Sequence, residues 1–260
     1  MVHIVHQKDK KKAFAEAVKD LTIEKNKTIA IKPNLSIKNE AACTDFELVS
    51  YVVDYLKTFS PQKILVVESD TYLRSIWDTY TYFGYQKLGV DLINVSEELC
   101  TTIWPKNTSF FKAFSYPEVL QDIDYIISFG KLKTHILTGY TGALKNQYGL
   151  IPFPDKRIFH KYLDKVIVGI NQIFPCHFYI LDGMKAMHKN GPLDGESIEL
   201  NLIFSGTDPV AIDHCACTVV SIDPDGVSHL VQAEKAGIGS FTYEVQGDIP
   251  DITEFILPDY

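Results

Sequence analysis

The stretch that decides the fold runs from Asp124 to Tyr148 and reads DYIISFGKLKTHILTGYTGALKNQY. It begins with an apolar run from Tyr125 to Phe129, which is too short for a helix and is followed by Gly130. Such a run indicates a buried strand of a parallel sheet. Polar residues begin where this predicted strand ends. Open α/β sheets bind ligands at the carboxyl ends of their strands, so the stretch also predicts a site.

Three basic side chains follow the predicted strand at alternate positions, and they belong to Lys131, Lys133 and His135. If the chain stays extended, alternate side chains point to the same face, so the three are predicted to lie together. We interpret the two lysines as ligands for an anionic substrate. His135 is a candidate general acid or base, because imidazole titrates near neutral pH.

The segment from Thr138 to Asn146 is typical of a helix start, with Thr138 or Thr141 as the N-cap. A strand, a loop with glycines and a helix N-terminus form a ready anion site. Thr141, Gly142 and Asn146 are therefore predicted to bind substrate. Lys145 would lie within the first two turns and act as an electrostatic group or as a nucleophile. The stretch lacks the Walker pattern of phosphate-binding loops.

The residues before this stretch alternate between predicted strands and helices. Strands are expected at 28–31, 63–68 and 90–95, helices at 10–21, 44–60 and 71–83, and an irregular strand pair at 99–117. This alternation predicts an α/β fold with a mainly parallel sheet and helices on both faces, as a single domain over residues 1–260 or as two closely packed α/β lobes. Lys32 and Asn34 follow the first of these strands, so they are candidate substrate ligands; the alternative is a solvated lysine and an asparagine that holds a turn.

The residues after the stretch supply three further candidates. A helix is expected from Asp155, and it would place Arg157 and His160 on one face as a substrate ligand and a catalytic acid or base. The predicted strand 177–182 ends in Asp182, which could bind a metal or orient a histidine. Residues 184–195 are predicted to form a turn-rich loop that covers the site. A strand at 200–204 and a helix from Pro209 follow.

Composition limits the classes of partner. The chain has 260 residues, 46% of them hydrophobic, and a formal net charge of -8. This balance argues against a nucleic-acid partner, because neutralising phosphates requires a broad basic face. No apolar segment approaches membrane-spanning length, and the first residues lack the apolar core of a signal peptide. We therefore expect a cytoplasmic protein without a membrane partner, which binds a small anionic molecule.

The five cysteines are Cys43, Cys100, Cys176, Cys215 and Cys217. Their odd number and wide spacing do not match a disulfide framework. No C-x-x-C motif occurs, so a ferredoxin-type cluster is not expected. If Cys215 and Cys217 lie on a helix, their side chains point in different directions, which favours burial over metal binding.

The runs KLKTH, TGYTGALKNQYGLIP, LDGMKAMHKNGPLDG and SGTDPVAIDH resemble the domain of unknown function 362 family. The likeness extends from the segment Ile31 to Leu35 (IKPNL) to the region near Gly239. It implies a fold rather than a reaction, because the family has no settled activity. Some relatives carry ferredoxin-like cysteine motifs that bind iron–sulfur clusters, and this chain would be a member that lacks them.

A second resemblance concerns three residues only. In order and approximate spacing, His135, Lys145 and His160 are similar to histidines and a cofactor-bearing lysine of the nickel-pincer lactate racemase family. That resemblance implies that Lys145 would contact a cofactor, while one histidine ligates a metal and the other moves a proton. The residues themselves identify no cofactor.

Three functions are compatible with these residues. The first is an enzyme that acts on a small carboxylate or phosphate by His/Lys acid–base or cofactor chemistry. The second is a redox accessory protein related to the cluster-bearing relatives, and the missing cysteine motifs count against it. The third is a non-catalytic protein that binds an anionic metabolite and needs the lysines but neither His135 nor His160. Substrate, cofactor and oligomeric state are left open.

Overall fold

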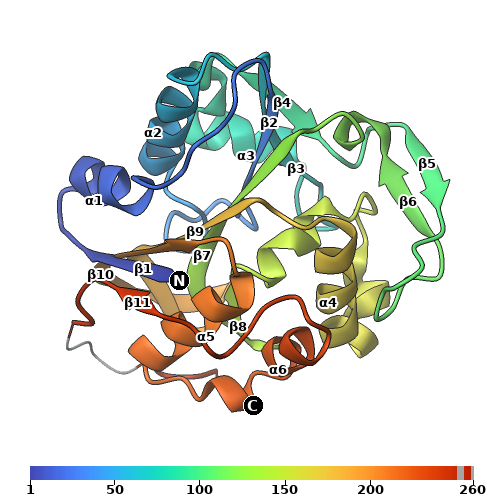
Figure 1. The fold of residues 1–260 in the computed structure, drawn as a ribbon. Coiled ribbons are helices and arrows are strands. Elements are labelled where there is room, and N and C mark those ends of the chain that lie inside the picture. The colour runs from blue at the N-terminus through green and yellow to red at the C-terminus, as the bar shows by residue number, and fades with distance from the viewer. Residues whose placement is uncertain (251–254, 259–260) are drawn as a thin grey trace.

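The computed structural model describes residues 1–250 and 255–258 and has an α/β fold (Figure 1). Most of its strands form one nine-stranded sheet in the order β11-β1-β10-β9-β7-β2-β3-β4, with β8 paired to β7 beside this path. A separate two-stranded ribbon pairs β5 with β6 at the outside of the molecule (Figure 1). The irregular strand pair predicted at 99–117 corresponds to this ribbon.

The strands are β1 (Val2–His6), β2 (Thr28–Pro33), β3 (Lys63–Glu68), β4 (Asp91–Asn94), β5 (Cys100–Ile103), β6 (Phe114–Pro117), β7 (Tyr125–His135), β8 (Gly139–Gly142), β9 (Phe178–Asn190), β10 (Asp194–Gly206) and β11 (Val245–Gln246). The α-helices are α1 (Lys10–Ala17), α2 (Phe46–Lys57), α3 (Ile76–Phe83), α4 (Leu163–Ile173), α5 (Pro209–Val219) and α6 (Ser228–Lys235). Short 3-10 helices are η1 (Tyr85–Leu88), η2 (Glu118–Leu120), η3 (Lys145–Leu150), η4 (Lys156–Tyr162) and η5 (Pro224–Gly226).

The centre of the sheet is parallel, as predicted. Strand β2 lies between β3 and β7 and runs parallel to both, β4 runs parallel to β3, and β9 runs parallel to β7. Beyond β9 the sheet becomes mixed, because β10 pairs with β9 and β1 pairs with β10 in antiparallel register. The parallel strands bring the carboxyl ends of β2, β3 and β7 to one edge.

Apolar side chains of the parallel strands alternate between two cores. On β2, Ile29 and Ile31 pack with α1, α2 and α3, whereas Ala30 packs on the opposite face with residues of α4. A third cluster joins β10 to α5 and α6. Helices therefore cover both faces of the sheet, as predicted (Figure 1).

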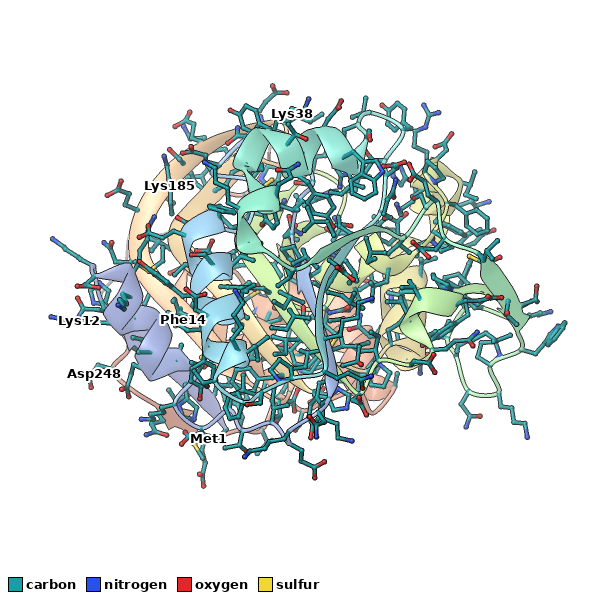
Figure 2. All side chains as sticks on the ribbon, turned by 90° about the horizontal axis from the view of Figure 1, so that it is seen from above. Met1, Lys12, Phe14, Lys38, Lys185 and Asp248 are labelled. Atoms are coloured by element: carbon teal, nitrogen blue, oxygen red, sulfur yellow. The ribbon has the colours of Figure 1, made fainter. Side chains whose placement is uncertain are left out.

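The first helix shows how a local pattern produces this packing. Asp9 caps α1 by accepting a hydrogen bond from the backbone N–H of Lys12. Phe14 is buried against the rings of Tyr51 and Tyr55 on α2, whereas Lys12 projects outward (Figure 2). Across the described part of the chain, none of the helices is both long and apolar enough to span a bilayer.

The prediction of a turn-rich loop at 184–195 is wrong. Strand β9 continues to Asn190, β10 begins at Asp194, and the two form a long antiparallel hairpin with Ala186 opposite Ile198. Ala186 and Met187 are fully buried, so this segment packs into the body of the protein instead of covering a site from outside. The cross-strand pairing outweighs the local turn signals, which mark only the residues between the two strands.

Candidate functional site

A cavity of about 340 Å³ opens at the carboxyl edge of β2, β3 and β7, where open α/β sheets bind ligands. We call it the edge cavity. All three predicted catalytic residues and five of the predicted substrate ligands line it: His135, Lys145, His160, Asn34, Lys133, Thr141, Asn146 and Arg157. Lys32, Lys131, Gly142 and Asp182 lie outside its lining, and each of these is described below.

Lys133 contributes charge to the edge cavity rather than a free donor. Its side chain is 1% exposed, and Nζ donates to Asn34 Oδ1 (2.9 Å), Ser36 Oγ (2.9 Å) and Ala42 O (2.6 Å). These contacts use all three ammonium protons. Burial lowers the pKa of Lys133 to about 8. The residue therefore holds the 34–42 segment in place and adds positive charge beneath the cavity.

Lys131 does not share this environment, although it is two residues away on the same strand. The pairing of β7 with β9 shifts register between Lys131 and Lys133. Lys131 Nζ forms a buried ion pair with Asp182 Oδ2 at 2.7 Å. It lines a second hollow of about 730 Å³, in which it is accompanied by Lys10, Asp45 and other residues. The structure therefore separates Lys131 from Lys133 and His135.

Asp182 has both carboxylate oxygens occupied within the protein. Oδ2 accepts from Lys131 and from the backbone N–H of Asp45 (2.9 Å), and Oδ1 accepts from the N–H of Met184 (2.9 Å). The five cysteines are free thiols. Among residues 1–250 and 255–258, no group of three or more His, Cys, Asp or Glu side chains is placed to hold a metal ion.

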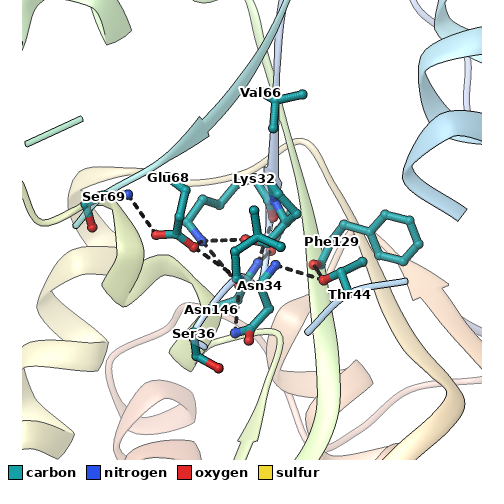
Figure 3. Close-up of polar contacts among 12 residues, drawn as sticks. Lys32, Asn34, Ser36, Thr44, Val66, Glu68, Ser69, Phe129 and Asn146 are labelled. Atoms are coloured by element: carbon teal, nitrogen blue, oxygen red, sulfur yellow. Dashed lines mark hydrogen bonds and ion pairs between the residues drawn. The ribbon is translucent and has the colours of Figure 1, made fainter. Parts of the chain in front are cut away.

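A buried polar network supports the cavity from below (Figure 3). Lys32 Nζ lies between Glu68 Oε2 (2.8 Å), Asn146 Oδ1 (3.3 Å) and the carbonyl of Pro33 (2.7 Å). Asn146 donates from Nδ2 to the Lys32 carbonyl (2.9 Å) and to Ser128 Oγ (3.0 Å). Lys32 is thus a buried partner of Glu68, and Asn146 joins β2 and β7 to the helix that begins at Lys145.

The turn before Lys145 differs from the predicted helix start. Residues 139–142 form β8, which folds back on β7, and the 3-10 helix η3 begins only at Lys145. The carboxylate of Asp213 on α5 accepts from the backbone N–H groups of Ala143 (2.6 Å) and Leu144 (2.9 Å). These amides were expected to face a ligand, but a side chain from the opposite half of the chain occupies them. Gly142 belongs to this turn.

Thr141 keeps a free hydroxyl beside this turn. The side chain is 2% exposed, and within the described residues its Oγ1 has no hydrogen-bond partner. A buried hydroxyl without a partner is unfavourable unless something else satisfies it. Because Thr141 lines the edge cavity, a ligand there would supply the missing partner.

Lys145 is the cavity side chain best suited to acid–base or nucleophilic chemistry. In the described part of the chain, its ammonium group has neither a hydrogen bond nor an ion pair, and none of its neighbours on η3 carries a charge. Burial, and next the nearby cation of Lys133, lower the pKa of Lys145 to about 7. The amine is therefore partly neutral at physiological pH, as an acid–base group or a nucleophile requires.

The two predicted catalytic histidines lie near Lys145 in different settings. His135 Nδ1 accepts a hydrogen bond from the N–H of Leu137 (3.1 Å), so the neutral ring carries its proton on Nε2. Burial, and next the charge of Lys145, hold the pKa of His135 well below its usual value. His160 on η4 is exposed, and burial of part of its ring together with Lys145 also lowers its pKa.

Sequence reasoning missed two further cations of the edge cavity. Lys156 is 7% exposed and donates to Ser69 Oγ (2.8 Å) and Asp70 O (2.6 Å), and burial lowers its pKa to about 8. Arg74 donates to the carbonyls of Ser36 (3.2 Å) and Ser69 (2.9 Å). The strand end at Glu68 to Asp70 was the available signal, because both cations bind there.

The charges of the lining favour an anion. Its lysines and arginines are Lys133, Lys145, Lys156, Arg74 and Arg157. Glu68 is the carboxylate of the lining in the described residues, and it is already paired with Lys32. Arg157 is paired with Asp155 (2.7 Å) and stacks on the ring of Tyr72 (3.9 Å to its centre). The excess of positive charge raises the local concentration of small anions.

Comparison with known proteins finds similarity to a curated protein by sequence and to solved structures by fold. The thylakoid-associated protein sll1697 of Synechocystis sp. (strain ATCC 27184 / PCC 6803 / Kazusa) is 25% identical over 146 residues, which are 54% of this chain and 46% of that protein. The match thus spans about half the length of this curated relative. The lactate racemase apoprotein from Thermoanaerobacterium thermosaccharolyticum superposes with a TM-score of 0.46 and 12% identity, covering 85% of this chain and 57% of that chain.

The family assignment rests on the sequence. Residues 29–218 match the family described as Domain of unknown function (DUF362). These residues include β7, η3 and all but one residue each of β2 and α5, and they contain every side chain that lines the edge cavity. The match covers well over half of the chain, so this protein belongs to the DUF362 family.

Proposed function

We propose that this protein is an enzyme that acts on a small carboxylate or phosphate in the edge cavity, with Lys145 as its proton-transfer group and His135 as a hydrogen-bond donor to the developing charge. The observation that carries the proposal is the unpaired amine of Lys145, which lies in a cationic cavity and has a pKa of about 7. A lysine that served only to bind an anion would not need a lowered pKa, because a full charge binds better.

Several donors are free to hold the anion. The amine of Lys145, which keeps two N–H groups when neutral, and the hydroxyl of Thr141 have no partners among the described residues. Lys156 uses two of its three protons within the protein, so one remains. Lys133 adds its charge from beneath. An anion at this point would satisfy Thr141 and neutralise a buried excess of positive charge.

Proton transfer would begin from the neutral amine of Lys145. The amine removes a proton from the carbon or oxygen next to the anionic group of the substrate and becomes an ammonium ion, which the substrate's negative charge stabilises. The Nε2–H group of His135 donates a hydrogen bond to the oxygen on which charge develops. His160 stands at the exposed side of the cavity and exchanges protons with solvent.

The first experiment tests the reactivity of Lys145. The protein is incubated with glyoxylate, an anionic aldehyde, and the resulting imine is reduced with cyanoborohydride and located by mass spectrometry. We expect modification of Lys145 in preference to other lysines and protection by inorganic phosphate. Lys145→Met removes this label, whereas Lys161→Met, an exposed neighbour on η4, leaves it unchanged. Labelling spread over exposed lysines with Lys145 unmodified contradicts the proposal.

A second experiment separates the enzyme from a non-catalytic binding protein. Small carboxylates and phosphate esters are incubated with the protein in deuterium oxide, and exchange of their C–H groups is followed by NMR. We expect exchange in at least one compound and its loss in His135→Ala and Lys145→Met, while His135→Ala retains binding by calorimetry. If at least one compound binds but none exchanges its C–H groups, the enzyme proposal fails and the binding protein remains; if His135→Ala and His160→Ala exchange like the unchanged protein, neither histidine takes part in the reaction.

A further inference from the structure

The mouth of the edge cavity is apolar, in contrast with its charged floor. Five large apolar side chains line it and remain between 43% and 57% exposed: Tyr72, Leu73, Ile136, Leu137 and Leu193. We call this group the rim. Exposed apolar groups that gather at one place mark binding sites, whereas single exposed ones are ordinary.

The rim residues stand where polar residues are usual. Tyr72 and Leu73 form the tip of a tight turn, Ile136 and Leu137 lie in the turn between β7 and β8, and Leu193 lies in the turn between β9 and β10. Turn tips normally carry Gly, Asn, Asp, Ser or Pro, which suit tight backbone geometry and water. Three separate turns carry apolar tips here, and all of them face the same cavity.

Backbone contacts hold the three turns in place. Thr71 and Arg74 exchange two backbone hydrogen bonds (3.0 and 3.1 Å), and the N–H of Ile136 donates to the carbonyl of Gly191 (3.0 Å). Thr134 Oγ1 donates to the carbonyl of Lys189 (2.6 Å), so the second and third turns are joined twice. The rim is therefore preformed, as small-molecule sites usually are.

The floor beneath the rim carries the charge. Lys133 and Lys156 are buried, Lys145 has no partner in the described residues, and the Thr141 hydroxyl is unsatisfied. An inorganic anion would satisfy this floor but leave the rim in water. A purely apolar ligand would fill the rim but cover the half-buried amine of Lys145 and the buried hydroxyl of Thr141 without giving either a partner, which is costly.

One ligand class satisfies both parts. We infer that the substrate is an amphiphilic anion, with a carboxylate or phosphate head on the floor and an aliphatic or aromatic body against the rim. This inference rests on the proposed function, and it specifies the substrate class of the same site. The cavity volume of about 340 Å³ lies at the lower end of the range of small-molecule pockets, roughly 300 to 1,000 Å³, so the body is a short chain or a single ring system.

Matched pairs of anions with the same head test the inference. The affinities of methyl phosphate and hexyl phosphate, and of acetate and hexanoate, are measured by calorimetry on the full chain. Each buried methylene strengthens binding about fourfold. We expect the longer member of one pair to bind at least tenfold more tightly, and the pair that does so identifies the head as phosphate or carboxylate.

Variants of rim residues test whether the rim causes the tighter binding of the longer anion. Leu73→Ser with Leu193→Ser, two exposed turn residues, reduces the ratio within that pair at least threefold and leaves the shorter anion unaffected. Leu99→Ser, which removes a 77% exposed leucine outside the cavity lining, leaves the ratio unchanged. Lys145→Met weakens both anions, because it removes the unpaired amine that donates hydrogen bonds to the head.

The outcomes separate the inference from the proposed function. Equal affinities within both pairs, with binding still lost in Lys145→Met, overturn the amphiphilic substrate and leave the anion site standing. A longer anion whose affinity does not depend on Lys145, or a ratio that the rim variants leave unchanged, overturns the inference as well. Binding of none of the four anions overturns the proposed function itself.

Discussion

The carboxylate of Asp213 lies in the space that a side chain on Gly142 would require. The two residues are 71 positions apart, yet together they shape the turn that presents Thr141 and Lys145 to the edge cavity. Gly142 has φ of +59°, in the left-handed region that favours glycine. Asp213 then binds the next two backbone amides. The site therefore depends on a contact between β8 and α5.

Replacing Gly142 by alanine should destabilise the protein. The new Cβ would collide with the Asp213 carboxylate, and the left-handed backbone adds about 1 to 2 kcal/mol for a residue with a Cβ. We expect urea denaturation to show a total loss of about 2 kcal/mol or more. Gly226→Ala is the control, because a Cβ there meets only ordinary contacts and the change should stay within about 0.5 kcal/mol. Equal effects of the two variants would contradict the role of this turn.

Asp213→Asn should destabilise the protein and alter its pH dependence. The amide would turn an NH₂ group toward a backbone N–H, which costs about 1 to 3 kcal/mol. Burial raises the pKa of Asp213 to about 7 from 3.8. Between these values the folded chain binds more protons than the unfolded chain, so the stability from this group is complete below pH 3.8 and falls as pH rises to 7.

The measurement for Asp213 is the free energy of unfolding between pH 4 and 7.5. The unchanged protein should be the more stable of the two at pH 4 and should lose this advantage as pH rises. The difference in free energy of unfolding between it and Asp213→Asn therefore narrows toward pH 7. Asp225→Asn, an exposed carboxylate, should run parallel to the unchanged protein. A difference that stays constant over this range would show that Asp213 does not titrate there.

Lys145→Met should stabilise the protein at neutral pH. Folding lowers the pKa of Lys145 from 10.5 to about 7, so the unfolded chain holds more protons between these values. The penalty is complete below pH 7 and disappears as pH rises to 10.5, which means that stability from this group increases with pH. We expect a gain of at least about 1 kcal/mol in chemical denaturation at pH 7 and a smaller gain at pH 9.5. A gain that grows with pH would contradict an unpaired, buried ammonium.

The pair of Lys131 and Asp182 should show strong coupling. Lys131→Met alone leaves a buried carboxylate without its cation and costs about 3 to 5 kcal/mol, whereas Lys131→Met with Asp182→Asn costs much less. Denaturation of these two variants and of Asp182→Asn alone measures this non-additivity. The double variant should bind inorganic phosphate within about threefold of the unchanged protein, because Lys131 lines the other hollow. Loss of phosphate binding in the double variant would place Lys131 in the anion site.

The structure confirms the local predictions that depend on strand patterns. The apolar run at 125–129 is the start of β7, and the strands at 28–31, 63–68 and 90–95 correspond to β2, β3 and β4. Parallel pairing then follows from the alternation with helices. Lys133 and His135 line the cavity because carboxyl ends of parallel strands meet at one edge, and Lys145 and His160 reach the same cavity from η3 and η4.

Two of the predictions that failed depend on contacts between distant segments, and the third depends on a hairpin between neighbouring strands. The helix expected from Thr138 is replaced by β8 and a turn bound to Asp213, and the loop expected at 184–195 is a strand pair. Lys131, predicted to share one environment with Lys133, is held by Asp182 across a shift in register. Asp182 lies 51 positions from Lys131 and Asp213 lies 70 positions from Ala143, so no local pattern contains these two partners.

The sequence by itself determined the α/β class, the mainly parallel pairing of the central strands and the group of basic residues that follow them, because these follow from the spacing of apolar residues and from where polar ones begin. Only the tertiary structure decided which of these cations are paired. Lys32 and Lys131 have buried carboxylates beside them, and Lys145 has none in the described residues. The reason is physical: whether a buried charge is neutralised depends on which side chain folding brings within about 3 Å, and spacing along the chain does not contain that distance.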